Sequence, residues 1–304
     1  MVQAAAVNIP SLSATNFATV YNLFSLAIAC LLFTSLYLVV SQRQVVREYR
    51  TAVVVSATVC GIAAYHYFRI FNNFQESYPA GATIDAPHTL SNIEFNEGYR
   101  YVDWLLTVPL LLLETVAVMA LGRAASKKLL VKLIPASALM IALGYPGELS
   151  NELGPRLLWG TLSTIPFLYL LYVLFVELSR SLDRQPPEVV HTIKMLRLAL
   201  VGLWGVYPIA YLFPVLGGDF FGGEGGFVLK QVGYSLADIL AKAAYGLAIY
   251  KVARVRSRLA DPAYDDDHAV EPVAAGADGL PARTAVAGST PVVNGHAPKA
   301  SRTS

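Results

Sequence analysis

Two ionisable side chains lie close together near the end of the chain, inside an otherwise apolar stretch. Asp238 and Lys242 are four residues apart, so on a helix they share one face, about one turn or ~6 Å from each other. One interpretation is a buried ion pair that only supports the fold. The other is a lysine that condenses with a carbonyl compound, with the carboxylate as counter-ion. The spacing by itself leaves both interpretations open.

A second group of polar residues follows helical spacing earlier in the chain. Arg100, Asp103, Thr107 and Glu114 recur at intervals of three, four and seven, which keeps them near one helix face. Asp103 and Glu114 are ~16 Å apart along the axis, with an apolar run between them. One carboxylate on each side of a central site is the arrangement that a proton path requires. The structural alternatives are an inner-interface carboxylate for Glu114 and an outer-interface anchor for Arg100.

Aromatic residues gather on a third segment. Trp204, Tyr207, Pro208 and Tyr211 stand at positions i, i+3, i+4 and i+7, so one helix face presents a flat aromatic wall. Core packing is the usual reason for such a stripe. The alternative is a long conjugated ligand held between Trp204 and Trp104.

The composition indicates what kind of protein positions these groups. Of the 304 residues, 55% are hydrophobic and only 14% are charged, and the mean hydropathy is +0.49. A soluble domain carries about 25% charged residues, so the composition argues against an ordinary soluble enzyme and against a disordered chain. The net charge of +2 gives no basis for nucleic-acid binding. The two cysteines, Cys30 and Cys60, lie in apolar runs and have no metal-binding spacing.

Seven apolar stretches are long enough to cross a membrane as helices. They cover residues 17–40, 49–74, 96–121, 129–146, 157–178, 189–215 and 227–255. The sequence therefore predicts an all-α membrane protein, a bundle of seven transmembrane helices. An ionisable group near the centre of such a helix costs at least ~2.5–3.5 kcal/mol, which favours a functional role for the groups above.

The loops predict the orientation and the ends of the folded part. Arg43, Arg47 and Arg50 lie on one side, whereas the alternate loops are acidic apart from Arg156 and Lys230. Basic loops face the cytoplasm, so we expect the N-terminus outside a plasma membrane and the C-terminus inside. We expect residues 1–15 to be an extracellular segment, residues 16–257 the helical domain, and residues 258–304 a disordered cytoplasmic tail.

Three motifs on three spans resemble one family. RYVDWLLTVPLLLLE at 100–114, WGVYPIAY at 204–211 and DILAK at 238–242 resemble the microbial (type 1) rhodopsins, and the likeness extends over all seven spans. Within that family, the pattern Asp103, Thr107 and Glu114 is similar to the outward proton pumps of the proteorhodopsin and xanthorhodopsin branch. AAYHYFRIF, LGYPGE and RLLWGTLSTIPF look specifically xanthorhodopsin-like.

The resemblance implies a light-driven outward proton pump. All-trans retinal would be attached to Lys242 as a protonated Schiff base. Asp103 would be the primary counter-ion and proton acceptor, and Asp238 the second counter-ion. Glu114 would be the cytoplasmic proton donor.

Two further residues would assist Asp103. Arg100, one turn outward, would respond when Asp103 is neutralised and guide proton release. His66 would hydrogen-bond Asp103, with a contact across a protomer interface as one form of that bond. Relatives form pentamers or trimers, so the resemblance implies a homo-oligomer surrounded by membrane lipids.

The resemblance also implies the lining of a retinal pocket. The residues carried over are Trp104, Thr107, Leu111, Met140, Gly144, Ser163, Trp204, Tyr207, Pro208 and Tyr211. Leu111 resembles the green-absorbing members. Gly160 stands where many relatives have a large aromatic residue, and in the xanthorhodopsins this glycine opens a gap through which a carotenoid antenna approaches the retinal. Close helix packing is the alternative reason for Gly160.

The chain departs from the haloarchaeal pumps at three positions. Glu114 replaces the aspartate donor, and Val108 replaces a second threonine beside retinal. Lys230 stands where those pumps carry an outer carboxylate of the proton-release pair. The identity of the release group is therefore open.

Other classes of function fit less well. Nothing matches the Asn-Asp-Gln set of the sodium pumps, and Asp103 argues against a chloride pump. A sensory photoreceptor signalling to a transducer is the alternative, but such sensors usually lack a donor like Glu114. A light-independent receptor or enzyme would make Asp238 and Lys242 a structural pair. The sequence has no metal-ligand cluster or nucleophile–base motif, so we expect a transporter and not an enzyme.

Overall fold

The computed structural model describes residues 9–150, 152–216, 223–261 and 264. Its long helices are α1 (Ala14–Ser41), α2 (Arg47–Ser77), α3 (Gly98–Ala117), α4 (Arg123–Glu148), α5 (Leu153–Ser181), α6 (Pro187–Leu216), α8 (Gly223–Asp238) and α9 (Tyr245–Ala260). The π-helical segment η3 (Ile239–Ala244) joins α8 to α9, so these three elements form one span. The seven predicted spans are confirmed as helices.

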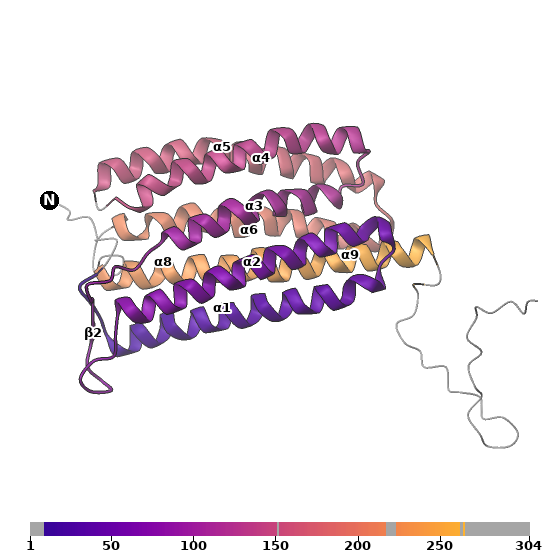
Figure 1. Ribbon diagram of the computed structural model, residues 1–304. Helices are drawn as coiled ribbons and strands as arrows, with labels where there is room; N and C mark the ends of the chain where they lie inside the picture. Colours follow the sequence, from indigo (N-terminus) through magenta and orange to yellow (C-terminus); the bar gives the residue numbers. More distant parts are fainter. Residues whose placement is uncertain (1–8, 151, 217–222, 262–263, 265–304) are drawn as a thin grey trace, which may run out of the picture. The chain divides into compact units, whose positions relative to one another are not determined.

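The helices form a closed ring in chain order. Each long helix packs on the next, α8 packs on both α6 and α1, and α9 packs on α2. Figure 1 shows them side by side along one common direction, with β2 (His88–Thr89) at one end and the end of α9 at the other. The central span α3 lies between α2 and α4, which brings its polar face into the interior.

Two short helices and one small sheet complete the described fold. The 3-10 helices η1 (Gln42–Gln44) and η2 (Leu182–Arg184) follow α1 and α5 at the predicted cytoplasmic end. At the other end β1 (Ser11–Leu12) pairs antiparallel with β2. This pairing ties the residues before α1 to the long connection between α2 and α3.

Six spans are long and apolar enough to cross a membrane by length and composition. The seventh, α3, has only 20 residues, and they include three ionisable ones, Arg100, Asp103 and Glu114. All three side chains are buried, while large apolar side chains such as Phe33 and Tyr172 are exposed on the outside of the bundle. This inverted distribution is suited to a lipid environment, where polar groups must be satisfied internally.

Several helix ends differ from the predicted ranges. Most helices run a few residues beyond the apolar stretch, but α3 stops at Ala117 and not at Leu121. The backbone of Ala120 has φ of 52°, a left-handed conformation that a helix cannot contain. The last helix, α9, continues to Ala260, past residue 258, where the tail is predicted to begin. Nearly all of the predicted tail lies outside the described residues, so its predicted disorder stays a prediction.

Candidate functional site

Lys242 lies in η3 with its side chain buried at 1% exposure. π turns occur often at functional sites in helices. The Lys242 Nζ atom lies 2.9 Å from Oδ2 of Asp103 on α3 and also bonds Oδ1 of Asp238. One amine and two carboxylates from two spans therefore meet inside the bundle.

The two carboxylates beside this amine are not equivalent. The hydroxyl groups of Tyr67 and Tyr207 donate hydrogen bonds to Asp238 at 2.8 and 2.7 Å. The indole N–H of Trp104 donates a third at 3.2 Å. In contrast, Oδ1 of Asp103 receives no hydrogen bond from any described residue. Asp238 therefore accepts three hydrogen bonds besides that of Lys242, whereas one oxygen of Asp103 has no partner among the described residues.

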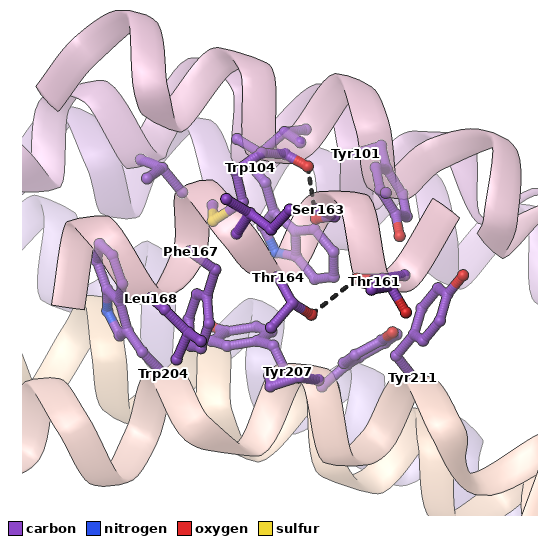
Figure 2. Close-up of a pocket in the computed structure, with 18 of the residues that line it drawn as sticks. Tyr101, Trp104, Thr161, Ser163, Thr164, Phe167, Leu168, Trp204, Tyr207 and Tyr211 are labelled. Carbon is purple, nitrogen blue, oxygen red and sulfur yellow. Dashed lines mark hydrogen bonds between the residues drawn. The ribbon is translucent and has the colours of Figure 1, made fainter. Parts of the chain in front are cut away.

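An apolar cavity of about 520 Å³ opens beside Lys242. Trp104 of α3 lies on one side of it, and Trp204 and Tyr207 of α6 lie on the other (Figure 2). Trp104 and Tyr207 meet edge to face, with ring centroids 5.2 Å apart. The predicted pocket residues found in its lining are Trp104, Leu111, Met140, Gly144, Gly160, Ser163, Trp204, Tyr207, Pro208 and Tyr211. Thr107 is buried nearby, and its hydroxyl donates to the backbone oxygen of Asp103 at 2.8 Å.

Gly160 on α5 lies against the ring of Tyr211 on α6. A Cβ atom at this position would lie 2.7 Å from Cε1 of Tyr211, closer than van der Waals contact allows. The same cavity is lined by Ile165, which is 65% exposed on the outer surface of α5, and by Leu168, which is 57% exposed. The cavity therefore reaches the lipid-facing side of the bundle between α5 and α6, with Gly160 in its wall.

Glu114 is fully buried on the cytoplasmic side of Lys242. Its Oε2 accepts a hydrogen bond from Ser56 on α2, and its Oε1 has no partner among the described residues. Next to it, the hydroxyl groups of Thr115 and Tyr245 are 3.0 Å apart and join α3 to α9. Among the described residues, the hydrogen-bond partner of Glu114 is thus a single hydroxyl group, and no described cation forms an ion pair with it.

His66 lies beside Asp103 without the predicted hydrogen bond. The Nδ1 atom of His66 is 4.0 Å from Oδ1 of Asp103, which is too long for a hydrogen bond. That nitrogen is instead 3.0 Å from the backbone oxygen of Ile62. Within one chain, His66 is thus a neighbour of the acceptor and not its hydrogen-bond partner.

Arg100 points away from Asp103, toward the outer end. Its Nη1 donates to Oε2 of Glu97 at 2.9 Å and to Oε1 of Gln231 at 2.6 Å, and its Nη2 donates to Ser235 at 3.4 Å. The guanidinium group also lies over the ring of Tyr67, 5.7 Å from the centroid. Arg100 is therefore held one turn outward of Asp103 by groups on α8.

A buried ionic cluster at the outer end was missed by the sequence analysis. Lys230 Nζ lies 2.9 Å from Oε1 of both Glu97 and Glu148, and Arg156 Nη2 lies 3.2 Å from Oε1 of Glu148. The assignment of Arg156 and Lys230 to outer loops was wrong, because both lie in helices and are 1% exposed. Glu148, at the end of α4, is also fully buried. One available signal was that Lys230 precedes Asp238 by eight residues, which places both near one helix face.

A comparison with known protein families agrees with the motifs noted in the sequence. Residues 18–255 match the family described as bacteriorhodopsin-like protein. The chain belongs to the bacteriorhodopsin-like family. The resemblance seen in the motifs is thereby confirmed, and the chain is a multi-pass membrane protein.

Relatives and solved structures of this rhodopsin family cover most of the chain. The blue-light absorbing proteorhodopsin of gamma-proteobacterium Hot 75m4 is 30% identical over 232 residues, which is 76% of this chain and 84% of the relative. The structure of xanthorhodopsin, described as a light-driven ion pump with dual chromophore, is 42% identical with a TM-score of 0.76, covering 83% of this chain and 98% of the other. A thermophilic rhodopsin is also 42% identical, with a TM-score of 0.76 and coverage of 83% and 99%.

Overall identity does not decide the colour of this rhodopsin. The green-light absorbing proteorhodopsin of gamma-proteobacterium EBAC31A08 is 30% identical, as is the blue-light absorbing one. The prediction of green absorption therefore still depends on Leu111 alone.

Proposed function

We propose that the protein is a light-driven outward proton pump that carries retinal on Lys242. The observation that supports this most directly is the inequality of the two carboxylates beside the amine. Asp238 accepts three hydrogen bonds besides that of Lys242, whereas one oxygen of Asp103 has no hydrogen-bond partner in the part of the chain that the structure describes. A proton on the Lys242 nitrogen therefore has one preferred acceptor, and that acceptor lies outward of the amine.

The cavity fits the proposed cofactor. It is apolar, lies between aromatic side chains and includes the amine of Lys242 in its lining, as a long polyene with an aldehyde end requires. Retinal, bound to Lys242 through an imine, supplies light absorption and a light-driven change of shape.

The chain's own residues make the transfer directional. The Lys242 nitrogen holds a proton between Asp103 and Asp238 and passes it to Asp103. Glu114 then returns a proton to the nitrogen from the other side. The outward step works against ~2.3 kcal/mol per 100 mV and ~1.4 kcal/mol per pH unit. The two-sided arrangement of carboxylates is what prevents the proton from returning by the same path.

A carotenoid antenna is a further part of the proposal. The cavity wall at Gly160 lies between lipid-exposed residues of α5, where an elongated apolar pigment can approach from the membrane. The clearance there is limited by Tyr211, whose ring lies 2.7 Å from the position that a Cβ atom at residue 160 would take. We also propose that the pump is a homo-oligomer, with His66 near the protomer contact.

The test is an absorption spectrum with and without added retinal, followed by light-induced pH recording. Cells that contain the protein should gain a visible absorption band, acidify the medium in light, and lose this response on addition of an uncoupler. Lys242→Ala should stay colourless. A coloured protein with a slow photocycle and no pH change would overturn the pump and favour the sensory photoreceptor.

A further inference from the structure

A second cavity, of about 660 Å³, lies at the end of the bundle predicted to face the cytoplasm. Ala52 of α2 and Leu113 and Ala117 of α3 line it. Ala52 is one helical turn from Ser56, and the two α3 residues lie on either side of Glu114 in the sequence. The cavity therefore extends to within about one turn of the Glu114–Ser56 hydrogen bond.

A set of hydrogen bonds lies in the wall of this cavity and joins the end of α3 to two other parts of the chain. Arg256 of α9 donates to the backbone oxygen of Val118 at 2.9 Å and also bonds Oε1 of Gln185. The side-chain amide of Gln185, in the connection between α5 and α6, donates to the same Val118 oxygen at 3.1 Å. Arg184 adds a longer bond of 3.4 Å to the backbone oxygen of Met119. We call Arg256, Gln185 and the Val118 carbonyl the inner clasp.

The inner clasp acts on the turn of α3 that carries Glu114. The backbone N–H of Val118 donates to the backbone oxygen of Glu114 at 3.3 Å, so the clasped residue is part of the same helical turn. Immediately afterwards the chain leaves the helix through the left-handed Ala120. The position of this turn thus depends on side chains from two other parts of the bundle.

The inner clasp consists of hydrogen bonds and contains no described ion pair. Arg256 and Gln185 are both nearly buried, and no described carboxylate lies within ion-pair distance of Arg256. Its positive charge faces the negative end of the α3 dipole, the amide oxygen of Gln185 and the ring of Tyr49, with Glu48 in the lining of the same cavity beyond ion-pair distance. Such bonds are directional, so a small shift of α3 against α9 breaks them, whereas a direct ion pair would stretch.

We propose that the inner clasp holds the cytoplasmic end of α3 in place over Glu114. It thereby limits how fast cytoplasmic protons reach Glu114. The inference rests on the proposed proton transport. A donor must be shielded from the cytoplasm while it gives its proton to the Lys242 nitrogen, and accessible to the cytoplasm while it is refilled. In this chain the inner clasp shields Glu114 while it is formed and leaves Glu114 accessible when it is broken.

The first test uses backbone hydrogen–deuterium exchange on the full-length protein in the dark, which needs no photochemistry. Arg256→Gln and Gln185→Leu should raise exchange at Glu114–Leu121 by about tenfold, the factor expected from the loss of one charge-assisted hydrogen bond. Arg254→Gln is the matched control. It removes the same charge two residues away and breaks a bond to the Gln44 backbone oxygen instead. Its exchange at Glu114–Leu121 should stay unchanged.

The second test measures proton uptake after a light flash with a pH-sensitive dye. The same two variants should take up protons several-fold faster, whereas Arg256→Lys, which keeps a cationic donor for the Val118 oxygen, should stay close to the native rate. Arg254→Gln should behave like the native protein. A native rate in Arg256→Lys beside a faster rate in Arg256→Gln separates the inner clasp from a general effect of replacing Arg256.

The outcomes are decisive in each case. Faster exchange with unchanged uptake would show that the clasp only caps a helix and would overturn the proposal. Equal effects of Arg254→Gln and Arg256→Gln would attribute them to surface charge and overturn it as well. If Arg256→Gln does not fold, Gln185→Leu and Arg256→Lys decide: equal uptake rates in these two variants would overturn the proposal. If the native protein gives no light-driven pH change, the proposed function is wrong, whatever the exchange rates. The role of the inner clasp in proton uptake is then wrong as well.

Discussion

The Lys242 nitrogen lies 2.9 Å from Oδ2 of Asp103, and the other oxygen of that carboxylate receives no hydrogen bond from any described residue. Asp238, on the same span as the amine, accepts bonds from two tyrosines and a tryptophan. The amine therefore has one carboxylate that is held by several hydrogen bonds and one that has an oxygen without a described partner. This division of roles is the basis of the first prediction.

Replacing Asp103 should separate pigment formation from transport. In Asp103→Asn the acceptor is gone, but Asp238 still balances the charge on the Lys242 nitrogen, so the protein should remain coloured after retinal addition. Light-driven acidification should fall by ~10²-fold or more, the usual effect of losing an acid–base group. Flash photometry and pH recording measure the two properties. Unimpaired transport in this variant would show that the acceptor is another group.

Replacing Glu114 should slow only the return of the proton to the Lys242 nitrogen. Glu114→Gln keeps the size and the bond to Ser56 but cannot donate a carboxyl proton, so this step should slow by ~10²–10⁴-fold. The rate is followed by time-resolved absorption after a flash. A small membrane-permeant weak acid added to the solution should restore the rate. An unchanged rate would remove Glu114 as donor.

Lys230 should be more important for stability than an exposed lysine or arginine. Lys230→Met leaves Glu97 and Glu148 buried without their shared cation, which should lower the free energy of unfolding by ~3–5 kcal/mol. Arg180→Met is the control, because Arg180 pairs with Glu177 at the same 2.9 Å but is 68% exposed. Its effect should be below ~1 kcal/mol. Equal shifts in thermal unfolding would contradict this argument.

The effect of Lys230→Met should also depend on pH. Burial raises the pKa of Glu97, just before α3, but Lys230 and Arg100 more than offset this and lower it below its usual value. A carboxyl group with a lowered pKa stabilises the folded state above its unfolded pKa and loses that contribution as the pH falls. The difference in unfolding temperature between native protein and variant should therefore be largest near neutral pH and should shrink in acid. A difference that grows in acid would contradict the role of Glu97.

Gly160 should tolerate no side chain without movement of Tyr211. Gly160→Ala would place Cβ 2.7 Å from that ring and should destabilise the protein by ~1–3 kcal/mol. Gly154→Ala is the control on the same helix, since a Cβ there meets nothing within 4 Å and alanine favours the helix. Thermal unfolding of the two variants gives the comparison. If both were equally stable, close packing would not explain Gly160, and the antenna would be the better reason.

The amino-acid sequence by itself determined the helices and the identity of the central groups. Apolar length predicted seven spans, and the spacing within single helices placed Asp103 with Glu114 and Asp238 with Lys242. Such predictions succeed because they depend on the period of one helix and on the penalty for charge in lipid. They need no knowledge of how helices are rotated against each other.

Only the tertiary structure decided which residues from different helices meet. The bonds from Tyr67 and Tyr207 to Asp238, the bridge of Lys230 between Glu97 and Glu148, and the distance of His66 from Asp103 each depend on the packing of separate spans. Helical periodicity defines a face but not the neighbour that the face meets. The buried outer cluster was therefore taken for loop charges, since an ionisable residue near the end of a span looks the same in sequence whether water or another helix covers it.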